Sequence, residues 1–288
     1  MIIDGQLVAF QIQKKIGEAI DHLQMRKPGL AFIIVGKNPA SESYVRMKKK
    51  RCVEVGIFSI DREFPENISE KELLKEIDRL NQDPAIDGIL VQLPLPLHLS
   101  NRIILSAIDP EKDVDGFNPI NMGKLLLGES NGFTPCTPLG IQVLLTHSQI
   151  SLLGKHVVIL GRSTIVGKPL AALLMQKAPH CNATVTVANS LTENLNALCK
   201  TADVLVAAMG QPEFVKATMV KQGATVIDVG INRMKDGRIV GDVDFESVAP
   251  LCSHITPVPK GVGPMTIAML LSNTLLSYQR RMNRQKSS

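Results

Sequence analysis

The chain has 288 residues, enough for two domains that each bury a core of ordinary size. Its 32 Lys and Arg residues slightly outnumber its 27 Asp and Glu residues, so the formal charge of +5 is mild and suits a small anionic ligand. Aromatic residues make up only 3% and Trp is absent, which leaves few side chains on which single-stranded nucleic acid could stack. Nucleic acid is therefore not an expected partner.

The cysteines give no sign of a metal site or of disulfide bonds. All five are scattered along the chain without a C-x-x-C pair. We therefore expect no metal and a reducing compartment. The N-terminus "MIIDGQLVAF" lacks the features of a signal peptide, and no uncharged apolar run reaches the roughly 18 residues that span a bilayer. The sequence predicts a soluble, cytoplasmic protein that does not bind membranes.

The first part of the chain alternates helix-like and strand-like patterns. Helical spacing or helix-end signals occur at residues 7–26, 41–56 and 69–83, and short apolar runs typical of strands occur at 29–36 and 88–96. Ser41 is a candidate N-cap, and Ser69 with Glu72 forms a capping-box pattern. This alternation predicts a parallel sheet covered by helices on both faces.

A domain boundary is expected at "GFTPCTPLG", residues 132–140, where Thr137 and Pro138 are placed as N-cap and first residue of a new helix. Four apolar strands follow, each separated by about the length of a helix, which predicts a second doubly wound unit. The predicted fold is α/β with two doubly wound domains and a cleft between them. We expect residues 1–120 with the C-terminal helix 265–288 to form one domain, and residues 138–258 the other.

The segment "GRSTIVGKP" after the strand "HVVILG" is a variant of the dinucleotide-binding fingerprint. Gly161 suits the tight turn, Ser163 offers a small hydroxyl, and Gly167 allows the helix to pack closely. The backbone amides at the helix start would then face a pyrophosphate. The alternative is that these glycines serve only the strand-to-helix turn.

The second strand of this unit ends without the acidic residue that NAD-selective sites use for the ribose hydroxyl. It ends instead in Asn189 and Ser190, while Arg162 follows the first glycine and can meet an added phosphate. Both features favour NADP as the cofactor. The alternative is that Arg162 is an ordinary solvated residue.

Tyr44 and Lys48 lie four residues apart and therefore share one face of the predicted helix. The ring can pack on a flat substrate while the lysine serves proton chemistry, provided burial or neighbouring positive charge lowers the lysine pKa. Lys49, Lys50 and Arg51 could supply that charge. The alternatives are a solvated face, a nucleic-acid contact, or a landing site for an acidic substrate tail.

Two loops add polar groups. "GILVQLPLP" places Gln92 at the carboxyl end of a parallel strand, where such sheets bind ligands. "PEKDVDGF" places Asp113 and Asp115 in a loop that ends in glycine, and a carboxylate matches the paired N–H donors of an aminopyrimidinone ring. The alternative is that these prolines and the Asp-Gly pair only shape turns.

Taken together, the segments around these residues resemble the bifunctional methylenetetrahydrofolate dehydrogenase/cyclohydrolase family nearly end to end. They are "SYVRMKKKRCVEVGI", "DGILVQLPLP", "PEKDVDGF", "TPCTPLG", "GRSTIVGKP", "VIDVGIN" and "ITPVPKGVGPMTIAMLL". The resemblance implies NADP-dependent oxidation of 5,10-methylenetetrahydrofolate to the 5,10-methenyl form and its hydrolysis to 10-formyltetrahydrofolate. It also implies a homodimer, a folate-binding catalytic domain and a Rossmann-like NADP-binding domain.

The resemblance assigns roles to single residues. Lys48 matches the catalytic lysine, Tyr44 the tyrosine that stacks on the folate, Gln92 the glutamine that tunes the lysine, and Asp115 the aspartate that anchors the pterin. The other implied substrate contacts are Leu93, Pro259, Lys260 and Gly261. The implied cofactor contacts are Gly161, Arg162, Ser163, Ser190 and Ile231.

The chain departs from the family pattern at two places. The family usually has His-Ser-Arg/Lys-Thr where this chain has Asn189, Ser190, Leu191 and Thr192, so one or two cationic partners of the cofactor phosphate are missing. The family typically has Pro-Gly-Gly where Lys260 stands here, and a positive φ at this position would cost lysine about 1 kcal/mol. A monofunctional dehydrogenase and a non-catalytic folate- or nucleotide-binding protein remain as alternatives.

Overall fold

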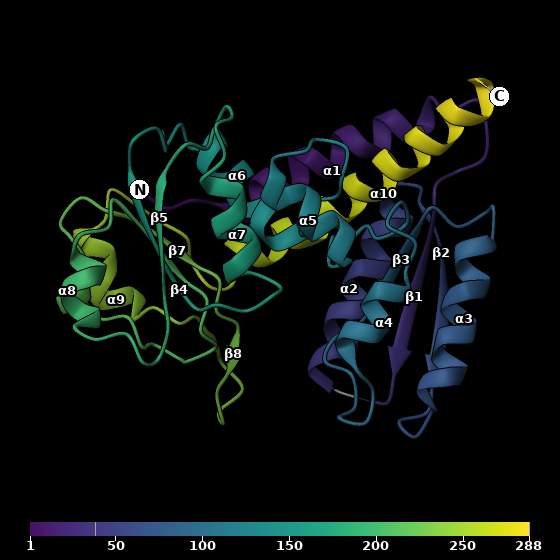
Figure 1. Cartoon of the computed structure of the whole chain (residues 1–288). Helices are drawn as coiled ribbons and strands as arrows, with labels where there is room; N and C mark the ends of the chain where they lie inside the picture. Colours follow the sequence, from purple (N-terminus) through teal and green to yellow (C-terminus); the bar gives the residue numbers. More distant parts are fainter. Residues whose placement is uncertain (38, 288) are drawn as a thin grey trace. The chain divides into compact units, whose positions relative to one another are not determined.

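The computed structural model describes residues 1–37 and 39–287 (Figure 1). The chain divides into two compact units. Residues Gln11–Thr134 and Ile267–Ser288 form one, called here the three-strand unit. Residues Met1–Phe10 and Pro135–Thr266 form the other, called the five-strand unit. Met1–Phe10 belongs with the five-strand unit because its backbone pairs there, with Ile3 N donating to Ile255 O at 2.8 Å.

The three-strand unit has a parallel sheet in the order β2-β1-β3 (Figure 1). Its strands are β1 (Gly29–Val35), β2 (Phe58–Phe64) and β3 (Gly88–Val91). Gly29 pairs with Phe58, and Leu30 pairs with Gly88. The prediction of a parallel sheet in this part of the chain is confirmed.

Helices surround this sheet. They are α1 (Gly5–Asp21), α2 (Pro39–Glu54), α3 (Glu70–Gln82), α4 (Asn101–Ala107), α5 (Pro119–Leu127) and α10 (Val262–Ser287). The predicted capping box is present at α3, since Ser69 Oγ accepts from Glu72 N at 3.2 Å and Glu72 Oε2 accepts from Ser69 N at 3.1 Å. The predicted N-cap at Ser41 is wrong, because α2 begins at Pro39 and Ser41 lies inside the helix.

The core of the three-strand unit lies on both faces of β1. Ala31, Ile33 and Val35 belong to one buried cluster that also holds Ile77 of α3 and Ile104 of α4. Leu30 and Phe32 alternate with them and are fully buried on the opposite face. This near-continuous apolar strand is typical of a parallel sheet covered on both sides.

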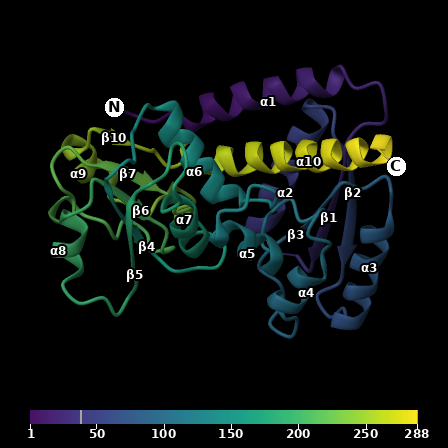
Figure 2. The same ribbon diagram turned by 45° about the horizontal axis from the view of Figure 1, so that its top comes forward.

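The five-strand unit has a parallel sheet in the order β10-β7-β6-β4-β5 (Figure 2). Its strands are β4 (His156–Leu160), β5 (Thr184–Ala188), β6 (Val204–Ala207), β7 (Thr225–Asp228) and β10 (His254–Ile255). A hairpin of β8 (Asn232–Arg233) and β9 (Ile239–Val240) and the short turns η1 (Ala217–Met219) and η2 (Ala249–Leu251) complete the strand connections. The four predicted strands are confirmed as β4 to β7.

Helices α6 (Cys136–His147) and α7 (Gly167–Leu174) lie on one side of this sheet, and α8 (Leu195–Lys200) and α9 (Phe245–Val248) on the other (Figure 2). The predicted start of α6 is wrong by two residues. The helix begins at Cys136 after Pro135, so Thr137 is not its N-cap. Thr137 Oγ1 instead lies 2.9 Å from Thr266 Oγ1.

In each sheet, the strands that follow the first one along the chain lie on opposite sides of it. In the three-strand unit β2 and β3 flank β1 on opposite sides, and in the five-strand unit β5 and β6 flank β4. Parallel sheets bind ligands at the carboxyl ends of the strands where the chain changes sides in this way. The expected positions are therefore the ends of β1 and β3 in one unit, and of β4 and β6 in the other. Within the described residues, no helix has the length and apolar character needed to cross a membrane.

Candidate functional site

Lys48, Gln92 and Tyr44 meet at the carboxyl edge of the three-strand sheet. Lys48 Nζ donates a hydrogen bond to Gln92 Oε1 at 3.2 Å and lies 4.9 Å from the centroid of the Tyr44 ring. Only 6% of Lys48 is exposed, so its ammonium group is withdrawn from water. An aromatic face within about 6 Å attracts such a cation. The two residues from α2 and the glutamine after β3 are thus brought together as predicted.

The position of Gln92 follows from the strand before it. Gln92 N donates to Ile33 O at 2.9 Å, which continues the β1–β3 ladder by one residue. Its side-chain Nε2 donates to Leu93 O at 2.7 Å. Because the amide nitrogen is bound in this way, the amide oxygen is turned toward Lys48.

Cys52 lies one helical turn after Lys48 and is fully buried. Burial raises the pKa of the Cys52 thiol to about 12, against the lowering effect of Lys48. The thiol is therefore neutral and serves as packing beneath the lysine. All five cysteines are free thiols.

The cationic run after Lys48 is engaged in ion pairs. Lys49 Nζ lies 2.6 Å from Asp61, and Lys50 and Arg51 both pair with Glu54, at 3.9 and 2.5 Å. These carboxylates offset much of the local positive charge. The ion pairs weaken the electrostatic attraction of this cationic run for nucleic acid or for an acidic substrate tail, which were two of its possible partners.

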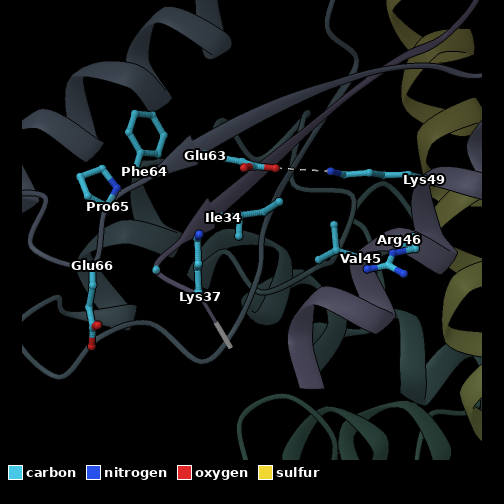
Figure 3. A pocket seen from close by; sticks show the side chains of 10 residues that line it. Ile34, Lys37, Val45, Arg46, Lys49, Glu63, Phe64, Pro65 and Glu66 are labelled. Carbon is cyan, nitrogen blue, oxygen red and sulfur yellow. Dashed lines mark ion pairs between the residues drawn. The ribbon is translucent and has the colours of Figure 1, made fainter. Parts of the chain in front are cut away.

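A cavity of about 740 Å³ opens beside α2 in the three-strand unit (Figure 3). Ile34 and Val45 line its apolar side, and Lys49 reaches across toward Glu63 at 3.8 Å (Figure 3). The cavity lies at the carboxyl ends of β1 and β2, beside α2, and its lining does not include Tyr44, Lys48 or Gln92. It is therefore distinct from the predicted catalytic group.

The loop that carries Asp115 is held by buried hydrogen bonds. Asp113, only 1% exposed, accepts from Asn118 N and from Asn121 Nδ2, both at 2.8 Å, and from Phe117 N at 3.1 Å. Burial raises the pKa of Asp113 to about 7, although these donors act in the opposite direction. Asp113 is thus a structural carboxylate, while Asp115 is half-buried two residues later.

The fingerprint loop of the five-strand unit has the geometry that its glycines predict. Gly161 follows β4 with φ +116°, and a Cβ there would lie 2.2 Å from Ala208 O, just after β6. A Cβ on Gly167 would lie 2.0 Å from Gly161 O. Ser163 Oγ accepts from Val166 N at 3.1 Å and from Gly167 N at 3.4 Å, which holds the turn that leads into α7. The turn forms a backbone cradle that leaves no room for side chains at either glycine.

The end of β5 forms a compact polar turn. Asn189 Oδ1 accepts from Leu191 N at 3.0 Å, and Asn189 N donates to Thr192 Oγ1 at 2.9 Å. Ser190 is exposed on this turn. Leu191 is 81% exposed where the family pattern has a cation, and Arg162 is exposed on the fingerprint loop.

Sequence reasoning missed two buried aspartates that shape the other strand ends. Asp228, the last residue of β7, accepts from Gly230 N, Asp242 N and Val243 N at 2.9 to 3.0 Å. Burial raises the pKa of Asp228 to about 6 against these donors. Asp242 Oδ2 accepts from Met209 N at 2.7 Å, in the loop after β6. The motif "VIDVGIN" contained Asp228 and Gly230, but the partners Asp242 and Val243 come from a later segment of the chain.

Ile231 and the segment Pro259–Gly261 are also placed in the five-strand unit. Ile231 is 59% exposed after β7, and a Cβ on Gly263 would lie 3.6 Å from its Cδ1. Lys260 has φ +83°, is exposed, and its carbonyl accepts from Gln6 N at 3.0 Å. A Cβ on Gly261 would lie 2.4 Å from Pro257 O. The backbone strain is thus at Lys260, whereas at position 261 only glycine fits, because a Cβ would collide with the backbone.

No group of His, Cys, Asp and Glu side chains suited to a metal ion occurs among the described residues. Each of the two units contains one candidate site. One has a buried lysine with an amide partner and an aromatic ring, and the other has a glycine turn at a helix start.

The comparisons with known proteins cover both units. A family model described as the tetrahydrofolate dehydrogenase/cyclohydrolase catalytic domain matches residues 3–115, and the model of the NAD(P)-binding domain of the same family matches residues 135–282. The bifunctional protein FolD of Protochlamydia amoebophila is 56% identical over 98% of this chain and 99% of its own length.

Solved structures give the same result. The bifunctional FolD enzyme of Campylobacter jejuni has a TM-score of 0.94 and 48% identity, covering 98% of this chain and 99% of that chain. The Trypanosoma brucei FolD, solved with NADP and an inhibitor, has a TM-score of 0.92 and 41% identity, covering 98% of each chain. The matches extend over nearly the whole chain, and this protein belongs to the tetrahydrofolate dehydrogenase/cyclohydrolase family.

Proposed function

We propose that this protein oxidises 5,10-methylenetetrahydrofolate with NADP and hydrolyses the resulting 5,10-methenyltetrahydrofolate to 10-formyltetrahydrofolate. The observation that carries the proposal is the buried Lys48–Gln92 pair beside Tyr44 in a member of this family. A dehydrogenase needs only to position two flat rings, whereas hydrolysis also needs a group that moves protons. A buried lysine with a fixed partner supplies such a group.

The residues of the three-strand unit have separate tasks in this proposal. Tyr44 packs its ring on the folate, and the Asp115 carboxylate accepts hydrogen bonds from the N–H donors of the pterin. Lys48, held by Gln92, directs water to the methenyl carbon in its neutral form and accepts a proton as the water adds. It then returns that proton to N5 as the bond from the carbon to N5 breaks, while the hydroxyl proton of the adduct is released to solvent and the formyl group stays on N10.

The five-strand unit fits NADP. The turn at Gly161 and Gly167 can form only because both positions lack a Cβ, and the amides at the helix start after such a turn suit a pyrophosphate. Arg162 and Ser190 are exposed and are the proposed contacts of the adenosine 2′-phosphate. Ile231 is also exposed and is the proposed contact near the nicotinamide end. NADP, when bound, supplies the acceptor for the hydride that leaves the methylene carbon. Pro259, Lys260, Gly261 and Leu93 are the further proposed folate contacts.

One assay tests both activities. Purified protein mixed with methylenetetrahydrofolate and NADP is expected to show the methenyl absorbance rise and then decay faster than spontaneous hydrolysis. A rise without accelerated decay would indicate the monofunctional dehydrogenase, which is the rival reading. No rise at all would contradict the enzyme and leave a folate- or nucleotide-binding protein.

We also propose a cytoplasmic homodimer. Among the described residues, β5 pairs on one side only, with β4, and Val187 on this edge strand is 37% exposed. An edge strand with apolar side chains is a common site for pairing with a second chain. The free thiols fit a reducing compartment. Light scattering during size-exclusion chromatography should give the mass of two chains, and the mass of one chain would contradict the dimer.

A further inference from the structure

We propose that Asn273 is a positioning residue for the folate. From α10 it fixes the peptide unit that carries Asp115, and so sets the affinity for the substrate without touching it. The inference rests on the proposed function, because it takes Asp115 as the pterin anchor. It adds a residue that the family resemblance did not assign.

Asn273 is buried, with 4% exposed, and its side-chain amide nitrogen donates to two backbone carbonyls. Its Nδ2 donates to Val114 O at 2.9 Å and to Thr134 O at 3.2 Å. The Val114 carbonyl belongs to the peptide unit that joins Val114 to Asp115. Because a peptide unit is planar, holding its oxygen fixes the direction from which the Asp115 backbone starts.

The other side of Asp115 is fixed independently. Gly116 N donates to Asp113 O at 3.0 Å, and the Asp113 carboxylate accepts from Phe117 N and Asn118 N. These bonds are local to the loop and set its curvature. Asn273 instead ties the loop to a helix 159 residues away in the chain. Removal of Asn273 is therefore expected to leave the loop formed but to let the peptide unit between Val114 and Asp115 shift.

Two further residues on α10 give a matched control. Ser277, one helical turn later, donates to Asp87 O at 2.6 Å and to Glu111 O at 2.8 Å. Arg281, one turn further, binds the Asp87 carboxylate at 2.8 Å. These residues hold the start of β3 and of the loop, four residues or more from Asp115. Asn273, by contrast, binds the carbonyl of the peptide unit next to the anchor.

The test compares Asn273→Leu with Ser277→Ala. Leucine has a similar size but no donor, so the Val114 carbonyl loses this bond. We expect the KM for the folate to rise about tenfold in both reactions, with kcat changed less than threefold and the KM for NADP within twofold of wild type. Ser277→Ala removes a buried bond of the same kind, and both KM values should stay within twofold.

A double-mutant cycle distinguishes an effect of Asn273 on the position of Asp115 from a general loss of packing in the three-strand unit. If Asn273 acts through Asp115, Asn273→Leu should raise the folate KM much less in an Asp115→Asn background than in wild type. A folded Asn273→Leu protein with an unchanged folate KM would overturn the inference. So would equal increases in the KM for folate and NADP, or an undiminished effect in the Asp115→Asn background.

Two conditions keep the result interpretable. Wild-type activity is measured first, because its absence would contradict the proposed function rather than the role of Asn273. If Asn273→Leu fails to fold, Asn273→Ala removes the same donor with a smaller side chain. A rise in the folate KM of this variant supports the inference, and an unchanged folate KM overturns it.

Discussion

The ammonium group of Lys48 donates to the amide oxygen of Gln92 at 3.2 Å, in a site where only 6% of the lysine is exposed. Gln92→Glu would put a carboxylate beside the ammonium and favour its charged form. A rise of one unit in the pKa of Lys48 would reduce its neutral fraction about tenfold. We therefore expect cyclohydrolase activity near neutral pH to fall about tenfold and its pH profile to move to higher pH. The profile of kcat against pH in the two reactions measures this.

Gln92→Met is the control for that change, since it removes the hydrogen bond without adding charge. It should lower activity without moving the pH profile upward. Identical profiles for the two variants would show that Gln92 does not tune the charge of Lys48.

Lys48→Met should separate the two activities. Methionine has a similar length but cannot transfer a proton, so cyclohydrolase activity should fall by about 10² or more, while part of the dehydrogenase activity remains. Lys49→Met is the matched control, because Lys49 is the next residue and pairs with Asp61. It should leave both activities close to wild type. Full cyclohydrolase activity in Lys48→Met would contradict the proposed mechanism.

Lys260 carries a measurable backbone cost. Its φ of +83° lies in the left-handed region, where a Cβ costs about 1 kcal/mol or more. Lys260→Gly should raise the free energy of unfolding by roughly 0.5 to 1 kcal/mol, after the greater chain entropy of glycine is subtracted. Urea unfolding measures this.

Lys260→Ala keeps the Cβ and removes the long side chain, so it should not stabilise the protein. Equal stabilisation by both variants would place the cost in the side chain instead. Unchanged KM values for both substrates in Lys260→Gly would show that the lysine does not tune the folate site.

Gly161 and Gly154 provide a test of the cofactor cradle. Both have positive φ, +116° and +69°, but only a Cβ on Gly161 would meet another atom, Ala208 O at 2.2 Å. Gly154→Ala should lower the free energy of unfolding by about 1 to 2 kcal/mol. Gly161→Ala should lower it by more than that and should also raise the KM for NADP. Gly154→Ala should leave that KM unchanged. The proposal fails if the two variants behave alike.

Much of the fold could be predicted because the signals were local. The capping box at Ser69 and Glu72, and the placement of Gln92 directly after a buried strand, depend on neighbouring residues only. β2 (Phe58–Phe64) was missed because its exposed and half-buried side chains include three charged residues, so it lacks the apolar run of the central strands.

The parts that could not be predicted depend on distant partners. Asp87 is fully buried between Arg26 and Arg281, at 2.6 and 2.8 Å, and lies 61 and 194 residues away from them in the chain. Nothing around Asp87 in the sequence indicates that pairing. The strain at Lys260 is similar, since the sequence raised the question but only the backbone angle answers it.

Asp113 makes stability depend on pH in a defined direction. Burial raises its folded pKa to about 7 from an ordinary value of 3.8, so the folded protein binds this proton more tightly than the unfolded chain does. The contribution is fully present below about pH 4 and is lost as pH rises toward 7. Asp113→Asn removes the titration while leaving Asp228, whose raised pKa acts in the same direction, unchanged. Urea unfolding of both proteins from pH 4 to 8 should show wild type losing stability relative to the variant up to about pH 7, with little further change above it. A difference that is constant over this range, or that grows in favour of wild type, would contradict the assignment of this proton to Asp113.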